Sequence, residues 1–371
     1  MKEDFLNQKL QERKDQHSLR ELLLPGTGID FFSNDYLGVV KNQLLETYLL
    51  GSDQPGRPLK HGSTGSRLLA GNYSMVEEAE NIISAFHQSQ AGLIFNSGYD
   101  ANIGLLSCIP RREDTIIYDY LSHASIRDGI RLSLAHSFSF RHNDLGDLEK
   151  KMQAASGQVF VVTESVFSMD GDMAPLAEMS ALCRKFGALL IVDEAHATGV
   201  VGDRGEGLVQ FLGLQQHCFA RVHTFGKALG CHGAIILGSH SLRNYLINFS
   251  RPFIYTTALP ESSIAAISAA YALFPSMVQQ RSHIGALISQ FQEADLPFER
   301  LHSNTPVQGI IVPGNERVRQ LSLKLQQAGI EARAILYPTV PKGSERLRLI
   351  LHAHNTPEEL RHLTEELVVR N

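Results

Sequence analysis

From Ser74 to about residue 238, short apolar runs alternate with segments that have the apolar spacing of amphipathic helices. Strands that alternate with helices are typical of a mostly parallel sheet with helices on both faces. We therefore predict an α/β fold with three α/β/α layers around a mostly parallel seven-stranded sheet. Strands are expected at 91–95, 115–118, 136–140, 159–163, 188–192, 220–223 and 234–237, and helices near 74–88, 100–108, 123–133, 145–155 and 175–186.

The pattern changes after about residue 260. Helices near 261–275 and 276–292 precede short strands at 307–312, 331–337 and 346–351, which predicts a smaller α+β domain. Thr356-Pro357-Glu358-Glu359 has the form of a capping box with proline at the first helical position, so a last helix is expected to begin there.

The N-terminal part of the chain is expected to form an arm. Residues 1–24 form a charged helical pattern that Pro25 and Gly26 end, and residues 51–71 form a long loop rich in glycine, serine and proline. At 371 residues the chain is long enough for about two domains. We expect three parts, listed as an arm at 1–45 that packs with the small domain, a large domain at 46–260 and the small domain at 261–371.

Charge and composition exclude several classes of protein. A net charge of -5 argues against nucleic-acid binding, which usually needs a basic surplus. The N-terminus lacks the apolar core of a signal peptide, and no apolar run approaches a membrane span. Four dispersed cysteines without a Cys-x-x-Cys pair fit a reducing compartment, so a cytoplasmic location is expected. Because His352-x-His354 stands alone, no metal site is expected.

Polar clusters follow five of the predicted strands. In an open α/β sheet, ligands bind beyond the carboxyl ends of the strands, so these clusters are expected to meet at one edge. The clusters are Asn96–Tyr99, Asp119–His123, Glu164–Asp170, Asp193–His196 and Thr224–Lys227.

Two of these clusters predict a pyridoxal-phosphate site. Asp193 and His196 follow the apolar run 188–192, and Lys227 lies between glycines in a region that is poor in charge. A desolvated lysine can form a Schiff base, and a carboxylate can keep a pyridine nitrogen protonated. An ordinary surface lysine, a core-capping aspartate and a structural histidine are the alternatives for these residues.

Other cofactor classes fit less well. Asp193-Glu194-Ala195-His196 also occurs in a class of helicases, but the required phosphate-binding loop is missing because Ala228 follows Gly226-Lys227. The Gly-x-Gly pairs at 26/28 and 205/207 lack the third glycine of a nicotinamide site.

Further residues extend the predicted site. Free amides at Ser97-Gly98-Tyr99 suit a phosphate at a helix start, although a plain strand-to-helix turn has the same pattern. Ser122 is a credible N-cap, which would make His123 a first-turn residue or a ring that stacks on a flat cofactor. Ser168 is either a turn hydroxyl or a donor to the phenolic oxygen of the cofactor.

Taken together, these segments resemble the α-oxoamine synthase family of fold-type I pyridoxal-phosphate enzymes. The resemblance extends from about Leu19 to the C-terminus. It is carried by Phe32–Gly38, Ser97–Tyr99, Leu121–Ser125, Val166–Asp172, Asp193–Gly199, Thr224–Lys227 and Pro338–Pro341.

The resemblance implies a role for each matching residue. Lys227 would hold the cofactor and move the proton, Asp193 would pair with the pyridine nitrogen, and His123 would stack on the ring. Ser168 and His196 would contact the phenolic oxygen. Gly98, Tyr99 and Thr224 would help hold the cofactor, and Thr256 and Thr257 would reach the phosphate of the neighbouring subunit in a homodimer. The implied substrate-binding residues are Arg20, Asn34, Thr339 and Arg348.

The implied reaction is the decarboxylative condensation of an amino acid with an acyl thioester. The nearest likeness is to family members that use L-alanine and a pimeloyl thioester, on coenzyme A or a carrier protein, in biotin synthesis. Glycine with acetyl-coenzyme A, as in glycine C-acetyltransferase, is an alternative, and a non-catalytic partner subunit is another. The segment between Arg20 and Phe32 is shorter than in the family, which affects the register of Arg20.

Overall fold

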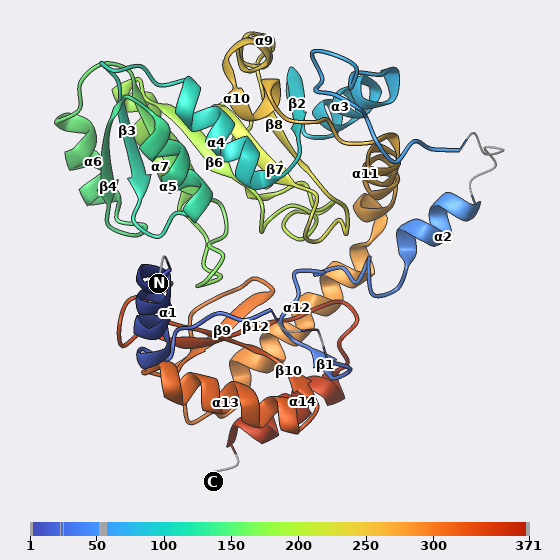
Figure 1. The fold of residues 1–371 in the computed structure, drawn as a ribbon, viewed down its shortest axis with the longest axis vertical. Coiled ribbons are helices and arrows are strands. Elements are labelled where there is room, and N and C mark those ends of the chain that lie inside the picture. The colour runs from blue at the N-terminus through green and yellow to red at the C-terminus, as the bar shows by residue number, and fades with distance from the viewer. Residues whose placement is uncertain (1–2, 23, 25, 52–57, 369–371) are drawn as a thin grey trace. The chain divides into compact units, whose positions relative to one another are not determined.

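The computed structural model describes residues 3–22, 24, 26–51 and 58–368 of the chain, in two compact units (Figure 1). The larger unit comprises residues 37–168 and 173–279, and the smaller unit comprises 1–36, 169–172 and 280–371. Parts of the predicted N-terminal helix, at residues 1–2 and 23, and of the predicted loop, at residues 52–57, lie outside the described residues, as does Pro25. The predicted division at 1–45, 46–260 and 261–371 stays a prediction.

The larger unit is built on a seven-stranded sheet with the order β2-β8-β7-β6-β5-β3-β4. β8 is antiparallel to both of its neighbours, and the other pairings are parallel, which confirms the predicted mostly parallel sheet. The strands are β2 (Ala91–Phe95), β3 (Thr115–Asp119), β4 (His136–Phe140), β5 (Val159–Glu164), β6 (Leu189–Asp193), β7 (Cys218–Thr224) and β8 (Ala234–Gly238).

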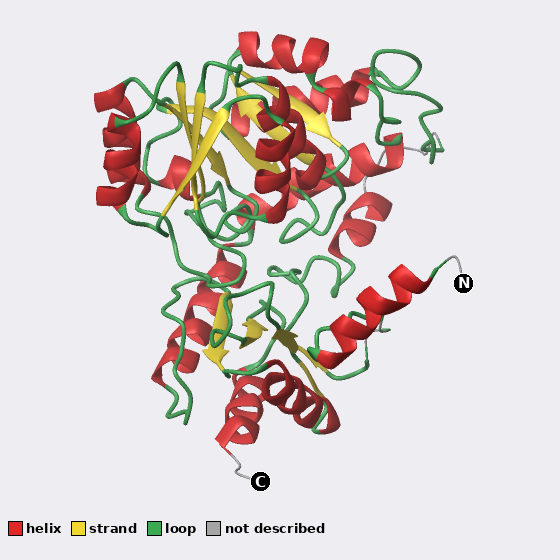
Figure 2. Cartoon of the chain, turned by 60° about the vertical axis from the view of Figure 1, so that its left-hand side comes forward, coloured by secondary structure: helices red, strands yellow, loops and turns green. Residues whose placement is uncertain are grey.

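Helices cover both faces of this sheet, as Figure 2 shows. Successive residues of a strand point to opposite faces, so a strand buried on both sides is apolar throughout. β5 is an example, because Phe160 and Val162 enter one core while Val159 and Val161 enter the other. The first core includes α4 (Gly98–Cys108), α5 (Ala124–Leu132), α9 (His240–Phe249) and α10 (Arg251–Ile254), and the second includes α6 (Leu145–Gln153), α7 (Leu176–Phe186) and α8 (Leu208–Phe211).

The remaining helices of the larger unit are α2 (Leu44–Gly51), α3 (Ser74–Phe86) and α11 (Glu261–Leu273), followed by the short 3-10 turn η1 (Phe274–Ser276). α2, α8, α9 and α10 were not predicted from the sequence. In α9 the start signal was present, because Ser239 caps the helix by accepting a hydrogen bond from the amide of Leu242 at 3.1 Å.

The smaller unit has two small sheets. β9 (Val307–Ile311), β11 (Arg333–Ile335) and β12 (Arg346–Ile350) form an antiparallel sheet, and β1 (Ile29–Asp30) pairs in parallel with β10 (Ile330–Glu331). Their apolar residues share one core with α12 (Val278–Glu293), α13 (Asn315–Gln327) and α14 (Pro357–Val368).

The capping box predicted for the last helix is confirmed. The amide of Glu359 donates to Thr356 Oγ1 at 3.1 Å, and the amide of Thr356 donates to Glu359 Oε2 at 2.9 Å. The N-terminal helix α1 is shorter than predicted, because it extends only from Asp4 to Asp15. His17 then adopts a positive φ of 50°, a backbone conformation that a helix does not contain.

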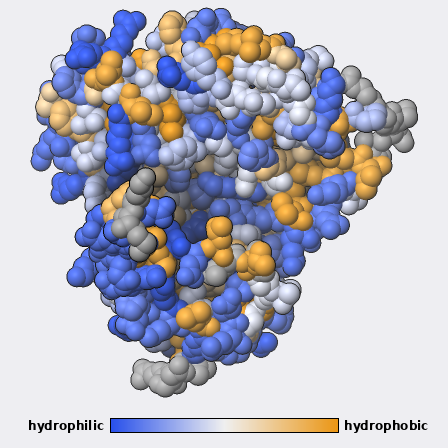
Figure 3. Space-filling model, in the orientation of Figure 1, coloured by the Kyte–Doolittle hydropathy of each residue, from blue (hydrophilic) through white to orange (hydrophobic). Residues whose placement is uncertain are grey.

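Apolar side chains are exposed on α2. Tyr48, Leu49 and Leu50 are exposed, and the exposed fraction of Leu50 reaches 87%. Figure 3 shows orange side chains near the grey segment that follows this helix, and other orange side chains elsewhere on the same face, including its top. Among the described helices, none has the length and apolar character needed to cross a membrane.

Candidate active site

Five predicted polar clusters begin at the carboxyl ends of β2, β3, β5, β6 and β7. The pairs β3–β5, β5–β6 and β6–β7 are parallel, and β2 and β7 have the same direction because each is antiparallel to β8. The five turns therefore begin at one edge of the sheet, as predicted. This edge positions the side chains of the candidate site.

Asp193 ends β6 and is 6% exposed. Its Oδ2 accepts a hydrogen bond from Asn102 Nδ2 at 2.7 Å, and its Oδ1 accepts one from the amide of Ala195 at 2.8 Å. A carboxylate has about four lone-pair positions, so two donors leave it able to accept another hydrogen bond. Asn102 lies on α4 and was not among the predicted site residues.

Lys227 lies in the loop that joins β7 to β8. The loop is closed at its ends, because the amide of Phe225 donates to Gly233 at 2.9 Å and the amide of Cys231 donates to Phe225 at 2.8 Å. Lys227 Nζ lies 2.8 Å from His196 Nε2, within hydrogen-bond distance. The structure therefore brings together two of the predicted catalytic residues.

His123 begins α5, and here the structure corrects the expectation for Ser122. The N-cap is His123 itself, whose Nδ1 accepts from the amide of Ser125 at 3.2 Å and lies 2.8 Å from Ser125 Oγ. Partial desolvation and Lys227 lower the pKa of the His123 imidazole, against the opposing charge of Asp193.

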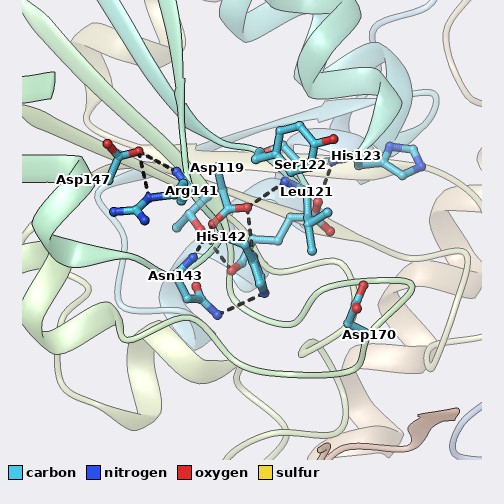
Figure 4. A network of polar contacts seen from close by, with 12 residues as sticks. Asp119, Leu121, Ser122, His123, Arg141, His142, Asn143, Asp147 and Asp170 are labelled. Atoms are coloured by element: carbon cyan, nitrogen blue, oxygen red, sulfur yellow. Dashed lines mark hydrogen bonds and ion pairs between the residues drawn. The ribbon is translucent and has the colours of Figure 1, made fainter. Parts of the chain in front are cut away.

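Buried carboxyl groups hold the backbone of His123 and of the turn before it. Its amide donates to Glu164 Oε1 at 2.6 Å, and Glu164 is 3% exposed at the end of β5. The preceding turn depends on buried Asp119, which accepts from the amides of Leu121 at 2.8 Å and Asn143 at 2.9 Å. Asp119 Oδ1 also lies 3.0 Å from His142 Nδ1, as Figure 4 shows.

Two further buried carboxyls have unusual proton affinities. Burial, followed by the charge of Asp193, raises the pKa of Glu164 to about 8. Burial also raises the pKa of Glu194 to about 7. The oxygens of Glu194 accept from the amides of Leu208 at 2.9 Å and Val209 at 2.7 Å, so this side chain stabilises the start of α8.

Gly98 and Thr224 lie side by side at the start of α4. A Cβ built on Gly98 would be 3.6 Å from Thr224 Oγ1. Ser97 caps the helix by accepting from the amide of Asp100 at 3.0 Å, which confirms a strand-to-helix turn with a helix N-terminus at this edge. Tyr99 is 44% exposed and its hydroxyl donates to Asp128.

The other predicted cofactor residues are distributed around this edge. Asn96 Nδ2 donates to Thr256 Oγ1 at 3.2 Å and to the carbonyl of Thr257 at 2.7 Å, so these two residues contact the turn after β2 of their own chain. Ser168 is half-buried in the turn after β5.

The predicted substrate-binding residues belong to the smaller unit. Arg348 on β12 is 8% exposed and donates from Nη2 to Asn34 Oδ1 at 3.1 Å. The hydroxyl of Tyr36 donates to the same oxygen at 3.3 Å. Burial lowers the pKa of Arg348 and raises the pKa of Tyr36 to about 12, so the pair keeps one positive charge at neutral pH.

Arg20 and Thr339 also meet in the smaller unit. Arg20 Nη2 donates to Thr339 Oγ1 at 3.2 Å in an exposed position. The shortened segment after Arg20 therefore leaves these two predicted residues in contact.

One group of metal-ligating residue types occurs among the described residues. Asp30, His352 and His354 have ligand atoms within 4.8 Å of one another, although the sequence suggested that the two histidines stand alone. His352 Nδ1 lies 3.0 Å from Asn355 Oδ1, and its Nε2 lies 3.0 Å from the carbonyl of Ser33. Both ring nitrogens of His352 are thus engaged with protein atoms, which favours a structural role.

Asn102, Glu164 and Tyr36 are the site residues that the sequence reasoning missed. Glu164 is the first residue of a predicted polar cluster, and Tyr36 lies within the segment Phe32–Gly38 that carries part of the family resemblance. Asn102 follows Gly98 by four positions, one helical turn, and this spacing was a signal that it shares the face of α4 near the site.

Comparisons with known proteins agree with this geometry. The family model for aminotransferase class I and II matches residues 27–367. The chain is similar to the 8-amino-7-oxononanoate synthases of Emericella nidulans, with 43% identity over 98% of this chain and 94% of that one, and of Marinobacter nauticus, with 38% identity over 91% and 86%.

Among solved structures, a serine palmitoyltransferase from S. paucimobilis with bound PLP superimposes with a TM-score of 0.86 at 26% identity, covering 99% of this chain and 96% of that one. The 8-amino-7-oxononanoate synthase of Francisella tularensis superimposes with a TM-score of 0.77 at 29% identity, covering 92% and 97%.

Proposed function

Because the chain belongs to the α-oxoamine synthases of the aminotransferase class I and II family, we propose that it condenses L-alanine with a pimeloyl thioester. The products are 8-amino-7-oxononanoate, carbon dioxide and the free thiol, in biotin synthesis. Relatives at 38–43% identity that carry this name over nearly the whole chain support the choice of substrates. The observation that carries the proposal is the placement of Lys227 against His196 at the sheet edge that Asp193 also borders.

The residues at this edge fit pyridoxal phosphate. Asp193 is a buried carboxylate with remaining acceptor capacity, which a protonated pyridine nitrogen requires. Lys227 supplies an amine, and the start of α4 at Gly98 supplies backbone amides suited to a phosphate. When bound, the cofactor supplies an electron sink for the negative charge that develops at the α-carbon of the amino acid.

Lys227 is the base of the proposed reaction. Its Nζ takes the α-proton of the amino acid and returns a proton at the end, and His196 keeps that nitrogen oriented. Asp193 holds a positive charge on the pyridine nitrogen, and Asn102 fixes its carboxylate. His123, held by Glu164 and Ser125, would support the ring of the cofactor, and Ser168 and His196 would contact its phenolic oxygen.

The remaining assignments concern the phosphate and the amino acid. Gly98, Tyr99 and Thr224 would help to hold the cofactor, partly through its phosphate, and Thr256 and Thr257 would reach the phosphate held by a neighbouring subunit. Arg348 binds the carboxylate of the amino acid through a guanidinium that Asn34 orients. Arg20 and Thr339 contact the substrate from an exposed position.

A second candidate is another α-oxoamine synthase activity. The serine palmitoyltransferase superimposes with a higher TM-score than the 8-amino-7-oxononanoate synthase does, so the fold alone does not select the acyl group. Glycine with acetyl-coenzyme A is the corresponding reaction of glycine C-acetyltransferase. The mechanism at Lys227 and Asp193 is the same in each case.

We further propose that the protein is a cytoplasmic homodimer. All four cysteines are free in the structure, which fits a reducing compartment. Exposed apolar side chains on α2 and at Tyr255, which is 74% exposed, suit burial against a second copy of the chain. The molar mass in solution tests the dimer, and a monomer at micromolar concentration contradicts it.

A matrix of substrates tests the reaction. Alanine, glycine and serine are each combined with pimeloyl-coenzyme A, a pimeloyl carrier protein, acetyl-coenzyme A and palmitoyl-coenzyme A. The highest kcat/KM is expected for alanine with a pimeloyl donor, with carbon dioxide released in equal amount. A maximum for glycine with the acetyl donor supports the second candidate, and a protein that binds no pyridoxal phosphate contradicts both.

A further inference from the structure

Glu164 places a second carboxyl beside Asp193. The two residues are aligned neighbours at the ends of β5 and β6, and both strands are parallel, so their side chains point to the same face. Glu164 is 3% exposed and Asp193 is 6% exposed. Two adjacent buried carboxylates repel each other, and each loses the hydration that stabilises its charge.

The groups around Glu164 determine its proton affinity. Burial is the largest influence, and the charges of Asp193 and Asp119 act in the same direction; together they raise the pKa of Glu164 to about 8. Lys227 and the amide of His123 act in the opposite direction. At neutral pH the carboxyl of Glu164 is therefore mostly protonated, and it keeps an oxygen that accepts from the His123 amide at 2.6 Å.

We propose that Glu164 holds a proton in the cofactor-free site and releases it to solvent when the positively charged pyridine ring binds at Asp193. The inference rests on the proposed cofactor, because a cation that enters beside two carboxyls favours the charged form of both. The O–H bond of the carboxyl breaks, its electron pair stays on Glu164, and the proton leaves to water. This step is a proton transfer, and no group is oxidised or reduced.

Glu164 thus positions the turn that carries His123, and loss of its proton compensates the positive charge of the bound pyridine ring. Either form of the carboxyl accepts the hydrogen bond from His123, so the turn that carries the imidazole keeps its position while the charge below it changes. Glutamine has the same length and keeps an acceptor oxygen, but it cannot ionise. Glu164→Gln therefore removes the proton exchange and leaves the hydrogen bond.

The first experiment uses the full chain without cofactor. The pKa of Glu164 in the folded protein lies above its ordinary value of 4.5, so its stabilising contribution is present below that value and is lost as the pH rises through about 8. The thermal midpoint of the cofactor-free protein is expected to fall from about pH 5 to about pH 8, and to fall less in Glu164→Gln. Equal slopes in the two proteins overturn the inference.

The second experiment measures the affinity for pyridoxal phosphate by fluorescence over the same pH range. Release of one proton changes an equilibrium constant about tenfold per pH unit below the pKa. The affinity of the wild-type protein is therefore expected to rise with pH by up to about tenfold per unit more than that of Glu164→Gln. Proton release from Lys227 or from the cofactor occurs in both proteins and cancels in the comparison.

Glu178→Gln is the matched control, because it makes the same substitution at an exposed position in the first turn of α7. It is expected to follow the wild type in both experiments. If Glu164→Gln does not fold, infrared difference spectra of the wild-type protein decide the question. Addition of pyridoxal phosphate should remove the carbonyl band of a protonated carboxyl, and an unchanged band overturns the inference.

The outcomes separate this inference from the proposed function. A protein that binds no pyridoxal phosphate contradicts the proposed function, while the pH dependence of the cofactor-free protein still reports the proton on Glu164. A protein that binds the cofactor with the same pH dependence in both variants retains the proposed function and overturns the inference.

Discussion

The two units of the molecule assemble their candidate functional residues in different ways. In the larger unit, each residue follows its own strand, and parallel strand ends bring Asp193, Lys227 and Glu164 to one edge. In the smaller unit, Arg348 meets Asn34 across 314 positions of the chain, and Arg20 meets Thr339 across 319 positions. The larger unit obtains its site from topology, and the smaller unit obtains it from individual long-range contacts.

This difference predicts different kinetic roles. The residues proposed to hold the cofactor and move protons lie in the larger unit, so their loss is expected to reduce kcat or cofactor binding. Residues of the smaller unit are expected to act on the affinity for the amino acid. Single substitutions in the two units test this division of roles.

Lys227→Ala is expected to have the largest effect. Loss of the base that moves the α-proton should reduce turnover by at least about 10³-fold, and the visible absorbance of the bound cofactor should change. Product formation and absorbance are the measurements. Lys185→Ala, at an exposed lysine paired with Glu149, is the control and should keep nearly full activity. An active Lys227→Ala protein contradicts the assignment of the base.

Asp193→Asn is expected to reduce kcat by about 10²-fold or more, because an amide cannot hold a positive charge on the pyridine nitrogen. The KM for the amino acid should change much less. Stopped-flow and steady-state kinetics separate the two constants. A variant with normal kcat and a raised KM would place Asp193 among the substrate-binding residues and break the division between the units.

Arg348→Lys is expected to raise the KM for the amino acid by about 10- to 100-fold with a smaller effect on kcat. Lysine keeps the charge but loses the planar two-pronged geometry that recognises a carboxylate. Arg361→Lys, on the exposed side of α14, makes the same exchange and should leave KM unchanged. If Arg348→Lys reduces kcat alone, the smaller unit takes part in the chemical step.

Asn102→Ala is expected to weaken cofactor binding by about tenfold, because it removes a hydrogen bond to the charged Asp193 at 2.7 Å. The dissociation constant of pyridoxal phosphate, measured by fluorescence, reports the effect. Turnover at saturating cofactor should remain within about threefold of the wild type. An unchanged dissociation constant would mean that Asp193 keeps its orientation without Asn102.

Thr339→Ala is expected to have the smallest effect. The contact from Arg20 to Thr339 is exposed, and such contacts contribute about 1 kcal/mol or less. The KM for the acyl thioester and for the amino acid should change by less than about fivefold. A change larger than that of Arg348→Lys would show that this exposed pair binds substrate more strongly than the Arg348 pair does.

The same contrast explains how much the sequence could predict. All seven strands of the large sheet were predicted to within two residues. Strands such as β5 are buried on both faces and are nearly continuous apolar runs, whereas the edge strand β4 is mostly exposed and alternates phenylalanine with polar residues. The turns at their carboxyl ends gave Lys227, Asp193, His123 and His196 directly. The contact of Arg348 with Asn34 depends on tertiary pairing that no local pattern encodes, and the resemblance to a family supplied those two residues.

Other features escaped prediction for local reasons. α2 is a short helix in which Leu45 is buried but Tyr48, Leu49 and Leu50 are exposed, so its apolar residues do not repeat along one face. His123 replaces the expected Ser122 as N-cap because an imidazole nitrogen can accept the same hydrogen bond. The raised pKa of Glu164 results first from burial and then from the charge of Asp193 on the adjacent strand, and neither burial nor strand order is known before the fold is known.

The antiparallel direction of β8 has a consequence for motion around Lys227. A parallel neighbour would require a long crossover after β7, but here the chain returns at once and is fastened at both ends of the loop. The backbone of Lys227 is thus anchored while its four-carbon side chain remains the movable part. The Nζ of Lys227 can therefore move only by rotation about the bonds of its own side chain. A residue inserted in the loop would displace the Lys227 backbone and would not extend the reach of the amine.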